Sequence, residues 1–286
     1  MLVPDRADLT WPVLVANCIP LVTVSFTHLE PGSSAYPARL GALGWDCPLT
    51  VRGRLNAGPA VAVVGARAAS GTAMDRAHAI GKHLAAAGVH VVSGGALGID
   101  GAAHGGALAG GGTTTVVLGS GIDVLYPSRH ARMFETIVDR GGALVSMFPI
   151  GLLPRPSTFV QRNPLISALA DVVVVVEADV RSGSLSTARA AKDQGRILAA
   201  WPGSRGTDRL LDQGAAVVES PNDVMAALAG TPRYPAPVVL PTSRDAELVR
   251  DAIAGGARDI DSVVRVTGLS VRAVLRALPS IEARLS

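Results

Sequence analysis

Cysteine and aromatic residues are scarce in this chain of 286 residues, which has 2 Cys and is only 3% aromatic. Cys18 and Cys47 cannot make a disulfide framework, and no spacing of cysteine and histidine resembles a zinc site. We therefore expect a reduced, cytoplasmic setting and no metal. An aliphatic core with 32 Gly and 48% hydrophobic residues is typical of an α/β protein with many tight turns.

Long apolar runs are missing as well. Residues 13–26 are apolar, but Asn17 and Pro20 interrupt them, and neither a basic leader nor a clear cleavage site flanks them. The stretch is too short and too broken for a membrane span or a signal peptide. The sequence therefore predicts a protein without membrane attachment.

Lysine occurs only at Lys82 and Lys192, so nearly all the cations are arginines. The formal net charge is +3 and the isoelectric point is near 9.2, which permits a polyanionic partner without requiring one. Arginine suits bidentate contacts to phosphate. A GC-rich genome produces the same preference for arginine, so composition alone does not choose between these explanations.

Short apolar runs alternate with helical segments from Gly58 to about Gly230. Runs that are apolar on both faces belong to a parallel sheet covered by helices on each side. We predict an α/β fold, with an extended Rossmann-like parallel sheet and helices on both faces. The connection 147–163 contains three prolines, and we expect a short helix only at 164–170. The expected strands span 61–64, 89–92, 113–118, 143–146, 172–176, 196–200 and 216–218.

Composition divides the chain into four parts. Residues 1–58 are expected to form an N-terminal extension packed on a Rossmann-like domain at 59–230. Residues 231–243 are rich in proline and are predicted to be a stiff linker. Residues 244–286 are predicted to form a small helical, winged-helix-like domain with a helix-turn-helix core. Its nearly balanced charge favours protein docking or packing over sequence-specific DNA recognition.

The first candidate site is the turn Gly65-Ala66-Arg67-Ala68-Ala69-Ser70-Gly71, between an expected strand and an expected helix. Backbone N–H groups at such a turn point outward at the carboxyl edge of a parallel sheet, where anions bind. Arg67 is a candidate phosphate clamp, and the alternative is an arginine that caps its own loop. The turn is not the G-x-G-x-x-G fingerprint, and the chain contains no P-loop.

The next expected strand ends in Ser93-Gly94-Gly95-Ala96-Leu97-Gly98-Ile99-Asp100, before a helix that carries His104. Asp100 and His104 are one helical turn apart, so the carboxylate could orient the imidazole beside Ser93. The nucleophile elbow G-x-S-x-G is missing, and a catalytic triad is not the favoured interpretation. We expect Asp100 to cap the helix and His104 to be a structural hydrogen-bonding residue.

Polar residues follow two later segments. Asn163 is expected to cap the short helix while Arg162 faces the carboxyl edge of the sheet. Glu177 ends the apolar run 172–176. It either accepts hydrogen bonds from a neighbouring turn, which is the favoured interpretation, or polarises a ribose or a water. A second turn of small residues, Ser182-Gly183-Ser184, leads into an expected helix.

Seven motifs in order resemble the DNA-processing protein A family, also called DprA or Smf. The resemblance covers residues 36–219. It implies a homodimer that binds single-stranded DNA without sequence preference, has no catalytic turnover and no cofactor, and loads a RecA-type recombinase during natural transformation. The motifs are Gly65-Ala66-Arg67, Ser93-Gly94-x-Ala96-x-Gly98-Ile99-Asp100-x-x-Ala103-His104, Gly119-x-Gly121-x-Asp123-x-x-Tyr126-Pro127, Arg162-Asn163, Glu177, Ser182-Gly183-Ser184-x-x-Thr187-Ala188 and Pro202-Gly203.

The resemblance also implies which residues contact DNA. Three positions depart from the usual family residues: Pro164 replaces a cation, Met147 a glutamate and Asp208 an asparagine. The missing cation bears on DNA affinity, and the other two bear on packing. The implied DNA-binding and phosphate-binding residues are Gly65, Arg67, Ser70, Ser93, Gly94, Gly98, Gly119, Gly121, Arg162, Asn163, Ser182, Gly183, Ser184, Thr187 and Lys192.

The leading function is a single-stranded-DNA-binding mediator that protects incoming DNA. Binding is expected to be dominated by phosphate contacts, because stacking partners are few and Phe159 and Tyr126 are the best placed. The alternative is a nucleotide-binding or nucleotide-hydrolysing enzyme related to the phosphoribohydrolases, with Glu177 in the chemistry. Their P-G-G-x-G-T-x-x-E signature is not found here. A sequence-specific regulator that uses the C-terminal helices is the third and least favoured reading.

Overall fold

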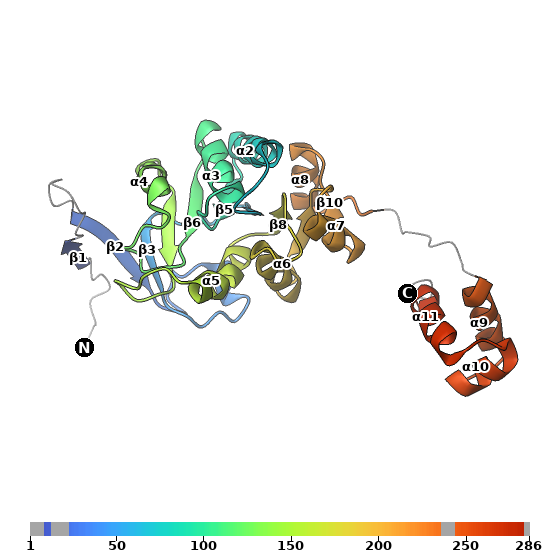
Figure 1. Cartoon of the computed structure of the whole chain (residues 1–286). Helices are drawn as coiled ribbons and strands as arrows, with labels where there is room; N and C mark the ends of the chain where they lie inside the picture. Colours follow the sequence, from blue (N-terminus) through green and yellow to red (C-terminus); the bar gives the residue numbers. More distant parts are fainter. Residues whose placement is uncertain (1–8, 13–22, 236–243, 283–286) are drawn as a thin grey trace. The chain divides into compact units, whose positions relative to one another are not determined.

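The computed structural model describes residues 9–12, 23–235 and 244–282 (Figure 1). The chain divides into two compact units, Met1–Pro235 and Ala236–Ser286, and each is described by itself. The division falls inside the proline-rich segment 231–243. Residues 236–243 of that segment, and residues 1–8 and 13–22 of the expected N-terminal extension, lie outside the described residues.

One mixed sheet runs through the described part of the first unit. Its strands are β1 (Leu9–Pro12), β2 (Thr23–Leu29), β3 (Leu49–Gly53), β4 (Ala60–Val64), β5 (His90–Ser93), β6 (Thr114–Val117), β7 (Ala143–Ser146), β8 (Val172–Val175), β9 (Ile197–Ala200) and β10 (Ala216–Val217). Their order is β1-β2-β3-β7-β6-β5-β4-β8-β9-β10. Neighbours from β7 to β10 are parallel, whereas β3 pairs with β7 in the antiparallel sense.

Helices cover both faces of this sheet (Figure 1). They are α1 (Ala38–Gly41), α2 (Gly71–Ala86), α3 (Ile99–Ala109), α4 (Ala131–Asp139), α5 (Pro156–Ala168), α6 (Ser184–Asp193), α7 (Arg205–Asp212) and α8 (Pro221–Leu228), with the 3-10 turn η1 (Ser128–His130) before α4. Helices α2, α3 and α8 pack on one face, and α5, α6 and α7 pack on the other. The predicted Rossmann-like fold is confirmed.

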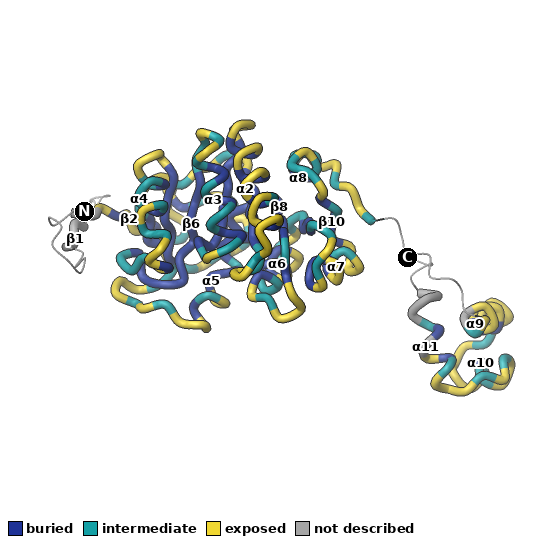
Figure 2. Tube along the Cα trace, turned by 45° about the horizontal axis from the view of Figure 1, so that its top comes forward, coloured by how far each residue is buried: buried dark blue, intermediate teal, exposed yellow. Residues whose placement is uncertain are grey.

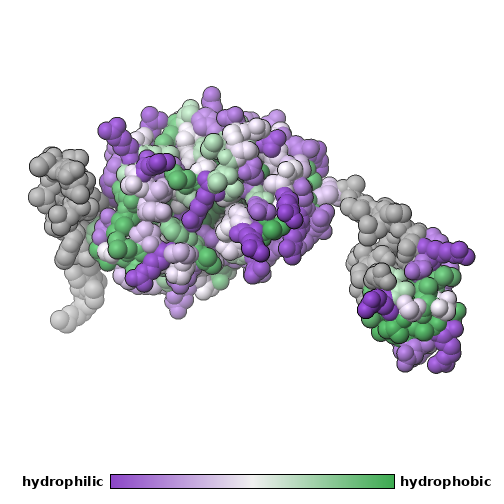
Figure 3. All heavy atoms as spheres, viewed as in Figure 1, coloured by the Kyte–Doolittle hydropathy of each residue, from purple (hydrophilic) through white to green (hydrophobic). Residues whose placement is uncertain are grey.

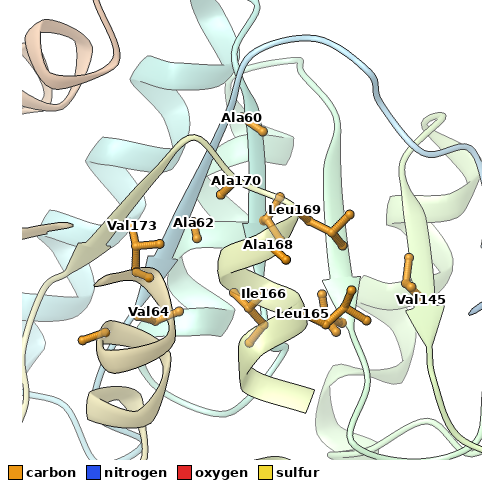
Figure 4. Close-up of a cluster of buried hydrophobic side chains, with 14 of the residues drawn as sticks. Ala60, Ala62, Val64, Val145, Leu165, Ile166, Ala168, Leu169, Ala170 and Val173 are labelled. Atoms are coloured by element: carbon orange, nitrogen blue, oxygen red, sulfur yellow. The ribbon is translucent and has the colours of Figure 1, made fainter. Parts of the chain in front are cut away.

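Strand β4 shows how the sequence produces these two layers. All of its residues are buried, and the strands at the centre of the sheet are dark blue in Figure 2. Successive side chains of a strand point to opposite faces of the sheet. Val61 and Val63 pack toward α2 and α3. Ala60, Ala62 and Val64 pack on the other face, against Leu165 and Ile166 of α5, as Figure 4 shows. The continuous apolar run is therefore the signature of a strand that is covered on both sides.

Helix α5 corrects the expectation of a long loop followed by a short helix at 164–170. The helix begins at Pro156 and runs through Pro164. A proline in the first turn is favourable because its missing N–H would have no partner there. A proline inside a helix costs about 3 kcal/mol, which the burial of Leu165 and Ile166 offsets. Asn163 is consequently a buried residue of the helix and not its cap.

The second unit consists, in its described residues, of three helices and no strand. They are α9 (Arg244–Ala254), α10 (Ile260–Thr267) and α11 (Val271–Glu282). They pack around a small core that includes Val249, Val263 and Val274. Gly268 adopts a left-handed conformation, with φ of 68°, at the turn between α10 and α11. Figure 3 shows hydrophobic residues on the surface of this unit, where Val266 is 68% exposed.

Candidate functional site

The candidate site lies where the order of the parallel strands reverses. The chain moves from β4 outward through β5, β6 and β7, and then returns to place β8 on the other side of β4. Loops that leave β4 and β8 diverge over opposite faces of the sheet, which opens a crevice at the carboxyl ends of these strands. A pocket of about 540 Å³ occupies this position, lined by the turn after β4, by α5 and by the turn before α6.

Arg67 and Phe159 lie side by side in the lining of this pocket. Arg67 is exposed, and its guanidinium carbon lies 4.6 Å from the centre of the Phe159 ring, a cation–π geometry. The ring of Tyr126, which is 46% exposed, lies 5.7 Å from that of Phe159. Within the described residues Arg67 forms no ion pair. A free cation beside two aromatic rings can meet both a phosphate and a base.

Arg162 also lines the pocket, but only 3% of it is exposed. Its Nη1 donates to the carbonyl oxygens of Gly94, at 2.8 Å, and Val117. Burial lowers the pKa of Arg162 to about 10, although the Asp100 carboxylate raises it. A Cβ at Gly94 would lie 2.4 Å from Nη2 of Arg162, so glycine is required there. The guanidinium is committed to the protein and does not face the carboxyl edge as a free cation.

Burial raises the pKa of Asp100, and the positive charge of Arg162 partly opposes this shift. Asp100 does not cap α3, because the cap position is Gly98. Its carboxylate accepts from the backbone N–H of Ala96 at 3.3 Å instead.

Ser93 and His104 do not form a catalytic triad with Asp100. The Ser93 hydroxyl is fully buried and donates to the carbonyl of Val63 at 2.7 Å. His104 is fully buried, and its Nδ1 lies 2.8 Å from the hydroxyl of Thr114. The two side chains therefore have structural partners, in agreement with the favoured interpretation of His104.

Ser70 and Glu177 hold the turn after β4 to the end of β8. The Ser70 hydroxyl donates to Glu177 Oε2 at 2.6 Å and accepts from the N–H of Ala73 at 3.2 Å, which caps α2. The N–H of Ser70 donates to Glu177 Oε1 at 3.1 Å. Glu177 thus accepts hydrogen bonds from a neighbouring turn. Neither residue lines the pocket, and their role is to position Arg67.

The glycines of the predicted site have two different roles. Gly65 lines the pocket beside Arg67, where a Cβ would meet the side chain of Ile99 at 2.6 Å. Gly98 lies outside the lining; its φ is 79°, and a Cβ would meet the carbonyl of Ala66 at 2.4 Å. Gly119 and Gly121 also lie outside it and allow close approach of Phe159 and of the Pro149 carbonyl, respectively. These three glycines therefore shape the pocket from behind.

The turn before α6 forms the opposite wall of the pocket. Ser182, Gly183, Ser184 and Thr187 all line it. The amide of Asn163 donates to the Gly183 carbonyl at 3.2 Å and to the Ser186 hydroxyl at 2.6 Å, and so ties this turn to α5.

Lys192 does not reach this pocket. It lies in a separate groove, where its ammonium donates to the carbonyl of Gln213 at 2.9 Å. The sequence analysis missed Arg181, which lines the pocket next to Ser182 and is exposed. An arginine directly before a turn of small residues was the available signal. Asp179 and Asp100 also line the pocket, so its three arginines outnumber its carboxylates by one.

The fold is an α/β Rossmann-like sheet with a pocket where the order of its parallel strands reverses. The chain belongs to the family described as DNA recombination-mediator protein A, whose sequence model matches residues 27–229. The protein Smf of Escherichia coli K12 is 41% identical over 211 residues, which cover 70% of this chain and 56% of Smf. A putative DNA processing protein DprA of Mycobacterium tuberculosis is 39% identical, over 78% of this chain and 60% of that protein.

Two solved structures share the fold. DprA of Streptococcus pneumoniae superposes with a TM-score of 0.65 at 36% identity, covering 70% of this chain and 74% of that one. DprA of Helicobacter pylori, whose structure concerns a single-stranded DNA binding mode, superposes with a TM-score of 0.62 at 27% identity, covering 73% and 97%. The chain spans little more than half the length of Smf and of the mycobacterial protein.

In the described residues no helix is long and apolar enough to cross a membrane.

Proposed function

We propose that this pocket binds single-stranded DNA without sequence preference. The exposed guanidinium of Arg67 contacts a phosphate, and the Phe159 ring beside it stacks on a base. The observation that carries the proposal is the 4.6 Å contact between these two groups in the pocket. Backbone groups of the Gly65 and Gly183 turns supply further polar contacts that do not depend on the base.

Family membership supports a wider role for the chain in DNA processing. We infer a cytoplasmic homodimer that protects incoming DNA and loads a RecA-type recombinase onto it in natural transformation. The pocket participates by holding the strand, and no catalytic step and no cofactor are assigned to it. The nucleotide-hydrolase alternative is not proposed, because the Glu177 carboxylate is engaged by the N–H and the hydroxyl of Ser70 and does not line the pocket.

The test is the affinity of Arg67→Gln for an oligothymidylate strand, measured by fluorescence anisotropy at two salt concentrations. Loss of one phosphate contact reduces the slope of log K against log salt by about 0.7 and weakens binding several-fold at low salt. Phe159→Leu weakens binding by about 1–3 kcal/mol, the contribution of one stacked base. The matched control is Lys82→Gln, which removes an exposed cation on α2 and leaves the affinity unchanged.

Duplex DNA of the same length serves as the competitor. We expect duplex DNA to displace the oligothymidylate strand from the protein less effectively than single-stranded DNA does, because paired bases cannot stack on Phe159. Unchanged affinity of both the Arg67→Gln and the Phe159→Leu variants at low salt would remove the pocket from DNA binding.

A further inference from the structure

A second groove, of about 370 Å³, lies between α6 and α7. Arg181 and Ser182 line both this groove and the pocket that holds Arg67. The two hollows are therefore neighbours that share one wall.

Four cations line this groove and no carboxylate does. Arg189 and Lys192 are three residues apart on α6 and lie on the same face of that helix. Arg209 comes from α7, and Arg181 closes the end of the groove nearest to the pocket. All four are exposed, and within the described residues none of them forms an ion pair.

Like charges that lie close together without a counter-charge repel one another. An anion that binds between them removes this repulsion and stabilises the folded chain. The hydrogen bond to the Gln213 carbonyl uses one of the three donors of the Lys192 ammonium, which leaves two for an anion. Of the larger apolar residues of the groove, Leu210 is only 7% exposed and Leu185 packs partly buried against the core. Val180, which is 38% exposed, is the one exposed apolar side chain of the lining, and this is a poor docking surface for a protein. The lining fits a polyanion.

We propose that the groove between α6 and α7 is a second phosphate-binding subsite, which continues the path of the DNA strand beyond the pocket. This inference rests on the proposed function of the pocket. It assigns a role to Arg181, Arg189, Lys192 and Arg209, and it makes the binding site longer than the pocket alone. A short strand fills the pocket only, whereas a longer strand also neutralises the groove.

The test compares oligothymidylates of about 5 and about 25 nucleotides, lengths that bracket single binding sites for single strands. The variant replaces Arg189, Lys192 and Arg209 with glutamine. Its control replaces three exposed cations on the side of the sheet where the parallel strands begin, Arg54, Lys82 and Arg140, and so removes the same charge. Circular dichroism verifies that both variants are folded.

We expect the groove variant to bind the long strand at least tenfold more weakly at low salt, with a salt slope reduced by about 2. Its affinity for the short strand stays within about twofold of the wild type. The control triple loses much less affinity for the long strand.

Three results overturn the subsite. In one, both strands respond equally to the groove variant. In another, the control triple has the same effect as the groove variant. In the third, the groove variant changes the oligomeric state in sedimentation without changing the affinity per chain, and the groove is then an interface with a second copy. Failure of the pocket itself is a separate outcome, because Arg67→Gln would then leave the affinity for the short strand unchanged.

Discussion

Gly119 sets the position of the Phe159 ring. A Cβ built at Gly119 would lie 2.5 Å from Cδ1 of Phe159 and 2.9 Å from Cε1, closer than real carbon atoms approach. Thr158, the neighbour of Phe159, donates its hydroxyl to the carbonyl of Gly119, so that the turn after β6 and the first turn of α5 are fastened together. The ring is therefore held against a backbone that has no side chain to displace it.

Gly119→Ala is expected to push the Phe159 ring out of its place beside Arg67. Affinity for oligothymidylate should fall about as far as in Phe159→Leu, because one stacking contact is lost in each. Anisotropy titration measures the effect. Gly41→Ala is the matched control, since a Cβ at Gly41 meets nothing within 4 Å. Equal affinities of the Gly119→Ala variant and the wild type would show that the ring position does not matter for binding.

Arg162→Met is expected to act on stability. The variant leaves the carboxylate of Asp100 buried without its cation and the carbonyl of Gly94 without its donor. Removing one member of a buried charge pair costs about 3–5 kcal/mol. Urea denaturation measures this as a lower midpoint. Arg233→Met, which breaks an exposed pair with Glu219, should leave the midpoint nearly unchanged. A stable Arg162→Met protein that has lost DNA affinity would contradict the structural role.

Two buried histidines make stability depend on pH. Burial lowers the pKa of His104 to about 3 and that of His90 to about 4, with Arg39 lowering the latter further. Thr114 donates to the Val91 carbonyl, so its oxygen accepts from Nδ1–H of His104. The buried Nε2 of His104 is then unprotonated, and it has no hydrogen-bond partner among the described residues. Protonation of His104 would place an N–H there with no acceptor.

The direction in which stability changes with pH follows from the number of protons that the folded and unfolded states bind. Unfolded histidine takes up a proton near pH 6.5, whereas both folded imidazoles stay neutral until about pH 4 or 3. The unfolded state therefore binds more protons below pH 6.5, and stability falls as the pH is lowered. Between pH 7.5 and pH 5 each histidine should remove about 2 kcal/mol. Urea denaturation measures the loss of stability between pH 7.5 and pH 5. In the His90→Gln variant this loss should be about 2 kcal/mol smaller than in the wild type. The control variant His78→Gln, which changes an exposed residue, should show the same loss as the wild type.

Truncation after Pro235 should leave the DNA affinity of the first unit intact. The second unit has its own small core, and every residue that lines the pocket or the groove precedes residue 214. The shortened chain should bind oligothymidylate within about twofold of the full chain, because its phosphate contacts are unchanged. A large loss of affinity would assign DNA contacts to the helices α9, α10 and α11.

Much of the fold follows directly from local sequence. The strand expected at 143–146 has the same bounds in the structure. Continuous aliphatic runs identify buried strands, and Ser220 followed by Pro221 marks the beginning of α8. The extent of α5 was not predictable by the same rules. Pro156 favours the beginning of a helix there, whereas Pro164 disfavours its continuation. Only the packing of Leu165 and Ile166 decides that the helix continues through Pro164.

The candidate site was predictable in its turns and not in its side-chain directions. The small-residue turn at 182–184, which the resemblance places in the site, lines the pocket. The burial of Arg162 depends on carbonyl groups 68 and 45 residues away in the chain and on the missing side chain of Gly94. The groove with Lys192 and Arg209 depends on how two helices meet. Such relations between distant segments leave no trace in a local motif.

The contact between Ser70 and Glu177 joins segments 107 residues apart, and the N–H of Ala66 donates to the Glu177 carbonyl at 2.8 Å. A nascent chain that has emerged from the ribosome only as far as α4 therefore contains Arg67. It still lacks Phe159 and the turn at 182–184, which forms the opposite wall of the pocket. The proposed DNA site is therefore complete only when β8 has joined β4. A strand held between the two walls would in turn stabilise the finished sheet against unfolding, because only the folded chain presents both walls.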